Sequence, residues 1–596
     1  MRTMLIGALV MGLALAGSPT AAQGQACGGL WDWGSNWNSE LGHRGLMASS
    51  WDSPSSVDLP YQVGSLSNVI SAAGSSHGTV AALSDGTVWM LGDYTTDYMP
   101  RQVMALVNNQ VVPLTGVESV AAGGGYDLVR LYDLYSGPAF WVACKSNGEV
   151  WTWGNNSDGQ LGYAGNYPDG VARQVPGLAG IDKVSAGGHH VLALDADSYC
   201  AWSWGGNHYG QLGQGTVDNN PHSTPASIDL PGVAALVLDV AAGLDHSLFA
   251  GTDSRVYACG CNDMLQLAVG TVMPGNEPSP LEVVIDWDTQ TQEWVLLEGI
   301  TKVAVGCQLS LALGADSGVW GWGANGSGQT GTGLMYDPIQ MAAPCQYYLG
   351  GAITNVDEIA AGAAHGMARI GTTVLTWGYN GNGQLGLGNT TSYNGAMAVS
   401  TITGGAQAIA SGCTAEHSLA IAANPISLTE SWDWTWAYGN LPVTTQDRHQ
   451  CILSLSLTDP AGAGSYTVDA RELTGGNAAF TILNMPTALT TITFQAGQRP
   501  SPDAQAALTG YVVEVRNTAD RTHLLHWQTG TPTRRKLGDI DGDGSVTAMD
   551  KLEMNKKLNG LYTPYPNRAF DLDGDASINA VDKLILNQIL NGIPLY

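Results

Sequence analysis

Two aspartate-rich segments near the C-terminus have the residue types and spacing that bind a hard metal ion. Each is twelve residues long and places oxygen-bearing side chains at positions 1, 3, 5, 7, 9 and 12. The candidate ligands are Asp539, Asp541, Asp543, Ser545, Thr547 and Asp550 in the first segment and Asp571, Asp573, Asp575, Ser577, Asn579 and Asp582 in the second. Clustered carboxylates repel one another unless a cation neutralises them, and EF-hand-type loops bind Ca²⁺ through oxygens at these positions. The sequence therefore predicts two calcium sites.

The two loops differ from the standard EF-hand pattern and from each other. Both end in aspartate rather than glutamate at position 12, and the second has Ala576 where the first has Gly544. Because glycine permits the sharp turn at this position, we expect the second site to be the weaker one. An amphipathic helix pattern follows each loop, at residues 549–560 and 581–592, and both patterns end in Leu-Asn-Gly.

Residues 538–596 resemble the dockerin module, of the type I kind, because they contain two such loop–helix repeats. The resemblance implies a small all-α, EF-hand-like domain, folded by calcium, that docks into a cohesin domain on a scaffold or a cell surface. The residues that match the family's partner-binding positions are Ala548, Met549, Asn555, Lys556, Ala580, Val581, Asn587 and Gln588. Dockerins usually accompany polysaccharide-degrading enzymes, but the dockerin itself is an attachment module and not a catalytic one.

Five histidines recur through the first two thirds of the chain, most of them in a phrase of the form Ala-Gly-x-x-His. They are His77, His190, His246, His365 and His417. A reaction needs one general base, so five copies at one repeat position are interpreted as scaffold residues that hydrogen-bond between strands. The same part of the chain has no nucleophile-elbow, zinc-protease or phosphate-loop motif.

A second phrase alternates with the histidine phrase: a tryptophan strand ends in glycine, and a Gly-Gln-Leu-Gly turn follows. Close copies start at Trp151, Trp202 and Val374. The glycine that ends the strand recurs 51 to 63 residues apart, at Gly34, Gly92, Gly154, Gly205, Gly260, Gly323 and Gly378. Short strands repeated at this period predict seven β-sheet blades arranged in a ring.

The two phrases together resemble the repeat of the regulator of chromosome condensation family, whose members, secreted bacterial ones among them, are seven-bladed β-propellers. The resemblance covers residues 27–423. No tryptophan strand follows residues 417–421, whereas residues 30–34 form one at the other end of the array. We therefore expect the N-terminal strand to complete the last blade and so remove the free sheet edges. Family members exchange nucleotide on a nuclear GTPase, bind chromatin or inhibit other proteins, so the resemblance implies a binding platform.

Two regions of the array depart from the repeat. One is the second repeat, at residues 94–101 and 131–141, and the other is residues 278–299, where Trp287 and Trp294 lie across an expected hairpin turn. Exposed aromatic side chains on such loops suit the binding of protein or of sugar rings. The alternative interpretation is that they pack a longer hairpin.

Composition and charge narrow the class of protein. Only 12% of the residues are charged and the formal net charge is −28, which excludes nucleic acid as a partner because phosphates need clusters of Lys and Arg. Residues 1–26 resemble a secretory signal peptide, with Arg2 before the apolar run 4–16. No later stretch reaches the roughly 18 apolar residues of a membrane span. The nine cysteines are scattered without zinc-site spacing, so most are interpreted as core residues, with one or two disulfides possible.

The segment between the array and the dockerin-like region has alternating strand patterns. They lie at residues 451–457, 465–473, 478–485, 490–497, 510–517 and 523–527, separated by turn residues. This spacing predicts a β-sandwich over residues 426–530, which resembles the immunoglobulin-like spacers of secreted bacterial proteins. Residues 531–537 are expected to form a linker.

The fold predicted is therefore mainly β: a seven-bladed propeller, a β-sandwich and a small all-α module. The function predicted is that of a secreted or cell-surface-attached modular binding protein, whose propeller binds a protein or a glycan and whose dockerin attaches it to a cohesin. Two alternatives stay open. One is a dockerin-borne glycoside hydrolase or lyase with its site in the central channel of the propeller. The other is a structural component of a surface or matrix.

Overall fold

The computed structural model describes most residues from Gly28 to Ala422, the strand backbones between Ser427 and Gly530, and the helical residues Lys551, Leu552, Met554, Asn555, Leu558, Lys583 and Leu586. Within the first range, the undescribed residues are 37–40, 42–55, 64–65, 67, 93–99, 125–138, 166, 168–169, 232–235, 271–274, 335–336, 401 and 403–404. The chain divides into two units, Met1–Asn424 and Pro425–Tyr596.

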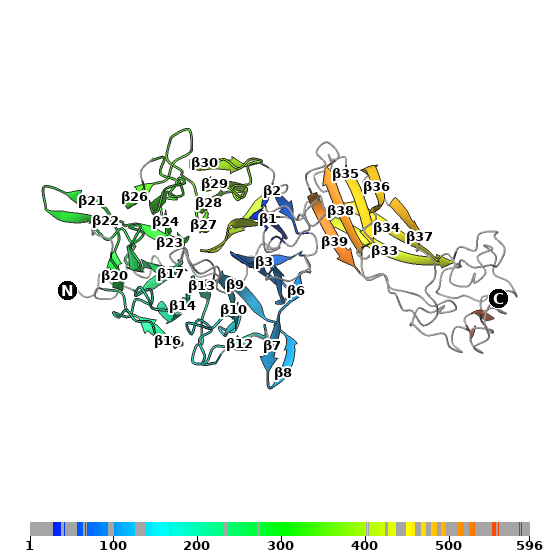
Figure 1. The fold of residues 1–596 in the computed structure, drawn as a ribbon, viewed down its shortest axis with the longest axis horizontal. Coiled ribbons are helices and arrows are strands. Elements are labelled where there is room, and N and C mark those ends of the chain that lie inside the picture. Colours follow the sequence, from blue (N-terminus) through cyan, green and yellow to red (C-terminus); the bar gives the residue numbers. More distant parts are fainter. Residues whose placement is uncertain are drawn as a thin grey trace, which may run out of the picture. The chain divides into compact units, whose positions relative to one another are not determined.

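The first unit contains seven antiparallel sheets of four strands, the blades of a β-propeller, arranged around a ring (Figure 1). Blade 1 comprises β3 (Val69–Ser75), β4 (Gly78–Leu83), β5 (Val88–Gly92) and β6 (Arg101–Gln102); blade 2 comprises β9 (Val117–Gly123), β10 (Phe140–Lys145), β11 (Val150–Gly154) and β12 (Arg173–Gln174). Blade 3 comprises β13 (Lys183–Ala186), β14 (His190–Asp195), β15 (Cys200–Gly205) and β16 (His222–Ile228); blade 4 comprises β17 (Val237–Ala242), β18 (His246–Gly251), β19 (Val256–Gly260) and β20 (Glu277–Glu282).

The remaining three blades complete the ring. Blade 5 comprises β23 (Ile300–Val305), β24 (Leu309–Gly314), β25 (Val319–Gly323) and β26 (Ile339–Pro344); blade 6 comprises β27 (Glu358–Ala361), β28 (His365–Ile370), β29 (Thr373–Gly378) and β30 (Tyr393–Val399). Blade 7 joins β31 (Ala406–Ala410) and β32 (His417–Ala422) to β1 (Gly29–Ser35) and β2 (Ser56–Gln62). Strand β1 pairs with β32 from Gly29↔Ala422 to Gly34↔His417. The prediction that the N-terminal strand completes the last blade is confirmed.

The tryptophan–glutamine phrase forms the joints between neighbouring blades. The indole Nε1 of Trp33, Trp204, Trp322 and Trp377 donates a hydrogen bond of 2.8–3.0 Å to the backbone carbonyl of a glutamine in the preceding blade. These glutamines are Gln384, Gln160, Gln266 and Gln329 respectively. The four tryptophans are fully buried. The repeated residues therefore have a structural role, which explains why they recur in successive blades.

Four of the five repeated histidines strengthen the same joints. The Nε2 atoms of His190, His246, His365 and His417 lie 2.8–3.0 Å from the hydroxyl oxygens of Ser247, Ser310, Ser418 and Thr79 in the next blade. Complete burial lowers the pKa of each of these histidines to about 3, so the rings are neutral. A Cβ at Gly187 or Gly243 would come within 2.5 Å of a histidine ring, which explains the Ala-Gly-x-x-His spacing. Their scaffold role is confirmed.

The fifth histidine, His77, does not occupy this position. Gly78 pairs with Gly92 in blade 1, as His190 pairs with Gly205 in blade 3, so His77 lies one residue before the repeated site. Its Nδ1 is 2.7 Å from the hydroxyl of Ser76. The interpretation of His77 as a fifth copy is wrong, because the shared Ala-Gly-x-x-His phrase is offset by one residue from the strand register.

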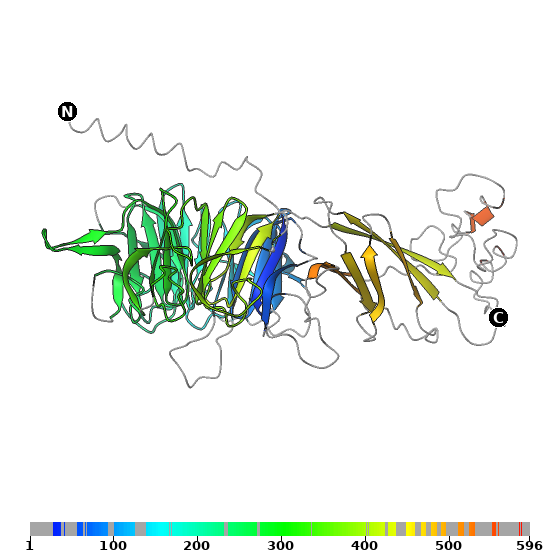
Figure 2. The same ribbon diagram turned by 90° about the horizontal axis from the view of Figure 1, so that it is seen from above.

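Two further hairpins are inserted between blades. The first, β7 (Met104–Val107) and β8 (Gln110–Pro113), lies between blades 1 and 2. The second, β21 (Val284–Asp288) and β22 (Glu293–Leu296), lies between blades 4 and 5. Figure 2, seen along the edge of the ring, shows the second hairpin extending away from the blades at the far left. Each insertion lies within or beside a region that departs from the sequence repeat.

The second unit contains two antiparallel sheets. One is β33 (Ser427–Trp436), β34 (His449–Thr458) and β37 (Thr490–Gln495); the other is β36 (Ala478–Met485), β35 (Tyr466–Glu472), β38 (Tyr511–Asn517) and β39 (Leu524–Gly530). Six of these strands coincide with the predicted patterns, and β33 was missed. Two sheets are what a β-sandwich requires, and the immunoglobulin-like assignment stays a prediction.

In the described part of the chain the seven cysteines are free, and six of them, all but Cys200, are buried.

Met554 and Leu586, each four residues after the last aspartate of its loop, are both 0% exposed. The same position of the two C-terminal repeats is therefore buried, as an amphipathic helix pattern requires.

Candidate functional site

One end of the propeller, here called the loop face, carries the loops that join the first strand to the second and the third strand to the fourth in each blade. On this face, residues 411–416 of blade 7 bond to the loops of five other blades. The partners are Ser76, Gly124, Ala186, Cys307 and Ala363, in blades 1, 2, 3, 5 and 6. A segment that reaches five blades from one lies on the ring axis. It fills the axis at this end of the propeller.

The groups that fill the axis are unsuited to catalysis. Cys413 and Thr414 are 3% and 4% exposed. Burial raises the pKa of the Cys307 thiol to about 12 and that of Cys413 well above its ordinary value, so both thiols are protonated at neutral pH. This arrangement gives no support to an enzyme site in the central channel.

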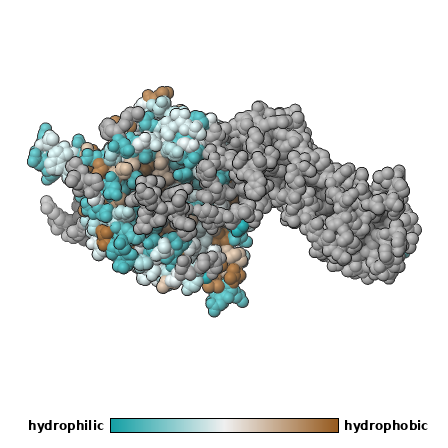
Figure 3. Space-filling model, viewed as in Figure 1, coloured by the Kyte–Doolittle hydropathy of each residue, from teal (hydrophilic) through white to brown (hydrophobic). Residues whose placement is uncertain are grey.

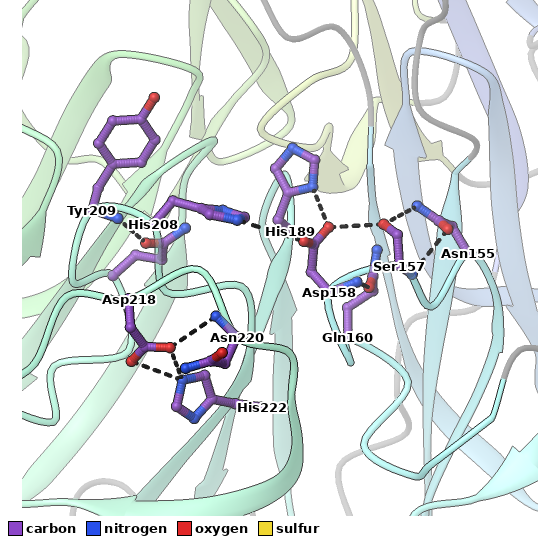
Figure 4. Close-up of polar contacts among 11 residues, drawn as sticks. Asn155, Ser157, Asp158, Gln160, His189, His208, Tyr209, Asp218, Asn220 and His222 are labelled. Atoms are coloured by element: carbon purple, nitrogen blue, oxygen red, sulfur yellow. Dashed lines mark hydrogen bonds and ion pairs between the residues drawn. The ribbon is translucent and has the colours of Figure 1, made fainter.

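A polar cluster lies on the loop face where blades 2 and 3 meet (Figure 4). Asp158 comes from the β11–β12 loop, His189 from the β13–β14 loop and His208 from the β15–β16 loop. The Nδ1 of His189 is 3.2 Å from Oδ2 of Asp158, and the Nε2 of His208 is 3.7 Å from Oδ1 of the same carboxylate. The repeat turn holds Asp158 in place, because its backbone N–H donates to Oε1 of Gln160 at 2.8 Å.

Asp158 is the acceptor at the centre of this cluster. Burial raises its pKa, but hydrogen bonds from His189 and Ser157 and electrostatic interactions with His189 and His208 outweigh burial, so the pKa lies below its ordinary value. The Ser157 hydroxyl donates to Oδ2 at 2.8 Å. A serine hydrolase needs histidine between the serine and the aspartate, whereas here the aspartate lies between them. The cluster is arranged to bind polar groups rather than to activate a nucleophile.

Neighbouring polar groups extend this surface. The Nε2 of His222 is 3.1 Å from Oδ1 of Asp218, and the backbone N–H of Asn220 donates to the same carboxylate. Among the described residues, no group of three or more His, Cys, Asp or Glu side chains is arranged to hold a metal ion. The described part of the propeller thus offers polar binding surface and no metal centre.

The joint between blades 6 and 7 carries a different pair at the position of Asp158 and His189. There the amide of Asn382 donates to Oε2 of Glu416 at 2.9 Å, and burial raises the pKa of Glu416. Both pairs occupy the variable positions of the repeat phrases, beside the constant glutamine and histidine. The sequence prediction missed them for this reason, and comparison of the variable positions across repeats was the signal that could have found them.

The predicted site residues fall mostly outside the part of the chain that the structure describes. This holds for all twelve calcium-ligand candidates, Asp539, Asp541, Asp543, Ser545, Thr547, Asp550, Asp571, Asp573, Asp575, Ser577, Asn579 and Asp582, and for seven of the eight partner-binding candidates. The eighth, Asn555, is helical and half-buried. The expected Trp287–Trp294 pair is confirmed: the residues are directly opposite in the β21–β22 hairpin.

Comparison with known proteins finds a repeat family in the first unit and a domain family in the second. The regulator of chromosome condensation (RCC1) repeat matches residues 147–194, 200–250 and 373–421, and a second description of that repeat matches 181–211 and 237–266. The dockerin type I domain matches residues 537–591. The chain contains RCC1 repeats, a seven-bladed propeller and a dockerin type I domain.

Individual relatives resemble the propeller part. The Arabidopsis thaliana ultraviolet-B receptor UVR8 is 28% identical over 274 residues, which are 45% of this chain and 57% of the receptor. The human E3 ubiquitin-protein ligase HERC2 is 27% identical over 384 residues, 63% of this chain and 7% of the ligase. The chain thus spans little more than half of one relative and a small part of the other.

Solved structures resemble the ring. Human WBSCR16 has a TM-score of 0.53 at 19% identity, covering 67% of this chain and 99% of that one. Prp20p from Saccharomyces cerevisiae has a TM-score of 0.52 at 19% identity, covering 67% and 92%. At this identity the likeness establishes the fold alone.

Of the matches found, the dockerin domain says most about function. Dockerin type I domains bind calcium and a cohesin partner and occur in extracellular or cell-surface proteins. The RCC1 propeller supports a role in protein binding. Among the residues that the structure describes, no helix has the length and apolar character to cross a membrane.

Proposed function

We propose that this protein is a secreted modular binding protein, in which the propeller binds a protein or glycan ligand and the calcium-dependent dockerin attaches it to a cohesin-bearing scaffold or cell surface. The observation that carries the proposal is the joining of a dockerin domain, at residues 537–591, to a propeller whose axis is filled by residues 411–416. The dockerin match supports attachment, the RCC1 repeats support protein binding, and the described part of the propeller gives no support to an enzyme site. The signal-like segment 1–26 supports secretion.

The donor set of the two C-terminal loops fits calcium. Each loop supplies carboxylate, hydroxyl or amide oxygens and no nitrogen or sulfur donor, which is the hard-oxygen set that Ca²⁺ prefers. We assign the first site to Asp539, Asp541, Asp543, Ser545, Thr547 and Asp550 and the second to Asp571, Asp573, Asp575, Ser577, Asn579 and Asp582. Bound calcium would neutralise the clustered carboxylates, so that the helices that follow the loops can pack.

The cohesin surface is proposed to lie on those helices. Its residues are Ala548, Met549, Asn555 and Lys556 in the first repeat and Ala580, Val581, Asn587 and Gln588 in the second. Apolar pairs at 548–549 and 580–581 favour a partner surface with an apolar centre, because desolvated apolar contacts dominate such interfaces.

The experiment is capture of the full chain on an immobilised type I cohesin, with Ca²⁺ and with a chelator. We expect capture with Ca²⁺ only, and loss of capture in the double variant Asp539→Ala, Asp571→Ala. Calorimetric titration with Ca²⁺ measures binding in the same samples. Capture that persists in chelator, or calcium binding that the double variant retains, would contradict the proposal.

A further inference from the structure

The β21–β22 hairpin has two chemically different faces. Its register pairs Asp286 with Val295, Trp287 with Trp294, and Asp288 with Glu293. Because directly opposite residues share a face and successive pairs alternate, the two tryptophans lie on one face, and the three carboxylates lie on the other together with Val295. The turn residues 289–292 are exposed, as are Asp286 and Glu293. The hairpin therefore presents an aromatic face and an acidic face to solvent.

The aromatic face is fixed in geometry and still open. The rings of Trp287 and Trp294 meet edge to face, with centroids 4.8 Å apart, and each residue is 38% exposed. Trp294 packs on Gly270, where a Cβ would come within 2.5 Å of the indole. Pre-ordered aromatic side chains lose little freedom when they contact a partner, which is why tryptophan is frequent at the centres of protein interfaces.

The charges on the acidic face destabilise the free hairpin. Asp288 and Glu293 are directly opposite, and like charges in this arrangement destabilise a strand pair. Backbone N–H groups of Gln290 and Thr291 donate to Asp288 and lower its pKa, so it stays ionised. In the described part of the chain no Lys or Arg pairs with Asp286, Asp288 or Glu293.

The cation at the base of the hairpin is already engaged. Arg255 contacts Glu282 at 2.6 Å and Glu298 at 3.3 Å. It therefore does not neutralise the three carboxylates nearer the tip. Among the described residues, no Lys or Arg side chain balances the negative charge of the acidic face.

We propose that the β21–β22 hairpin is a docking finger for a protein partner that places apolar side chains on the Trp287–Trp294 face and Lys or Arg side chains on the Asp286–Asp288–Glu293 face. The inference deepens the proposed function, on which it rests, by naming one binding element of the propeller and the chemistry of its partner. Charge complementarity selects the occupant. An anionic polysaccharide or a nucleic acid would be repelled, and a neutral glycan would leave the opposed carboxylates uncompensated.

The test uses the full chain in Ca²⁺ buffer and three immobilised probes. They are a short peptide in which Leu and Lys alternate, its twin with Glu in place of Lys, and a neutral β-linked oligosaccharide. We expect the Lys peptide alone to bind. Its affinity should fall about tenfold or more in the variant Trp287→Ala, Trp294→Ala and in Glu293→Lys, as for loss of central contacts and charge pairs. Asp197→Lys, an exposed charge-matched change in blade 3, should leave the affinity unchanged.

Glu293→Lys separates docking from a merely structural role. The change converts the Asp288–Glu293 repulsion into attraction, so amide hydrogen exchange in residues 284–296 should slow while peptide affinity falls. A structural role alone predicts slower exchange with unchanged affinity. Binding of the Glu peptide or the oligosaccharide, an equal effect of Asp197→Lys, or failure of the Lys peptide to bind would each overturn the finger.

Cohesin capture measured on the same samples keeps the two proposals apart. If the Lys peptide does not bind while cohesin capture stays Ca²⁺-dependent, the docking proposal is wrong and the proposed attachment function stands. If the full chain is not captured by cohesin while the Lys peptide binds, the proposed attachment function is wrong and the docking proposal stands.

Discussion

The two inserted hairpins are built on the same plan and are used differently by the fold. The β7–β8 hairpin is joined to blade 2: Leu106 N–H donates to the carbonyl of Ala172 at 2.9 Å, Ala172 N–H donates to Met104 at 2.8 Å, and Ala105 is 1% exposed. It has no charged residue, and Figure 3 shows hydrophobic surface on this projection at the lower edge of the ring. The β21–β22 hairpin is anchored at its base, where Val284 N–H donates to Ala268 at 2.9 Å.

This difference separates scaffold from binding element. An insertion that pairs with a blade and buries a side chain at that contact, as Ala105 is buried, extends the core at its base even though Val107 and Val111 stay exposed. An insertion that leaves two tryptophans exposed and opposes two carboxylates gains less stability in this way, and exposed aromatic residues of this kind are typical of interaction sites. The predictions that follow test whether the first hairpin and the blade joints carry stability while the second carries recognition.

The largest effect on the free energy of unfolding is expected at acid pH, which favours protonation of the buried histidines between the blades. Four buried histidines have a pKa of about 3 in the folded state, below their ordinary value of 6.5. Below pH 6.5 the unfolded chain binds more protons than the folded one, so stability present above that pH is lost progressively as the pH falls toward 3. Urea unfolding at a series of pH values measures this slope.

The variant His246→Gln should have a shallower pH slope, whereas replacement of residues 285–295 by a short Gly-Ser turn should leave the slope unchanged. A free energy of unfolding that is the same at neutral and mildly acidic pH would exclude buried neutral histidines. A slope altered by the hairpin replacement would remove the distinction between joint and hairpin.

A charge in the first hairpin is expected to have the next largest effect. Ala105→Asp places an unpaired carboxylate where the side chain is 1% exposed, which should lower the free energy of unfolding by about 3 kcal/mol. The matched change Thr291→Asp in the exposed turn of the second hairpin should cost less than about 0.5 kcal/mol. Thermal and urea unfolding compare the two. Equal losses would mean that both hairpins are equally part of the core.

Truncating one tryptophan is expected to have a smaller, local effect. Trp287→Ala removes the edge-to-face contact and should cost about 1 kcal/mol within the hairpin, with little change in the melting temperature of the ring. Amide hydrogen exchange resolves the two regions. If the whole propeller loses protection, the Trp pair stabilises the ring and the distinction between the hairpin and the scaffold fails.

The smallest effect, and one of opposite sign, is expected from Glu293→Lys. Replacing like charges by an opposite pair should stabilise the hairpin by up to about 0.5 kcal/mol. Exchange rates of residues 284–296 measure it, with Asp197→Lys as the control. A destabilised hairpin would mean that Glu293 has a structural role that the strand register does not reveal.

The periodic features of the fold could be predicted from the sequence because the same residues recur at a regular spacing in each repeat. The spacing of Gly154, Gly205 and Gly260 indicated the blades, and the missing tryptophan strand after residue 421 indicated the closure of the ring. The offset of His77 shows the limit, since one residue of slip moves a side chain to the other face of a strand while the phrase still matches.

Features that depend on contacts distant in sequence could not be predicted. Cys413 bonds to Ala186 across 227 residues, and nothing in residues 411–416 marks them as the segment that fills the axis. Asp158 and His189 meet only because adjacent blades bring two variable loop positions together. Trp287 and Trp294 were predictable because a hairpin needs only local register, and the like-charge pair beside them became informative once that register was known.

The most direct test of the distinction between scaffold and finger is amide hydrogen exchange of the full chain with and without the alternating Leu-Lys peptide. The account predicts that peptide slows exchange in residues 284–296 and leaves residues 104–113 and the loop-face residues 155–160 and 187–190 unchanged. Protection confined to the first hairpin or to the loop face, with none in residues 284–296, would contradict it.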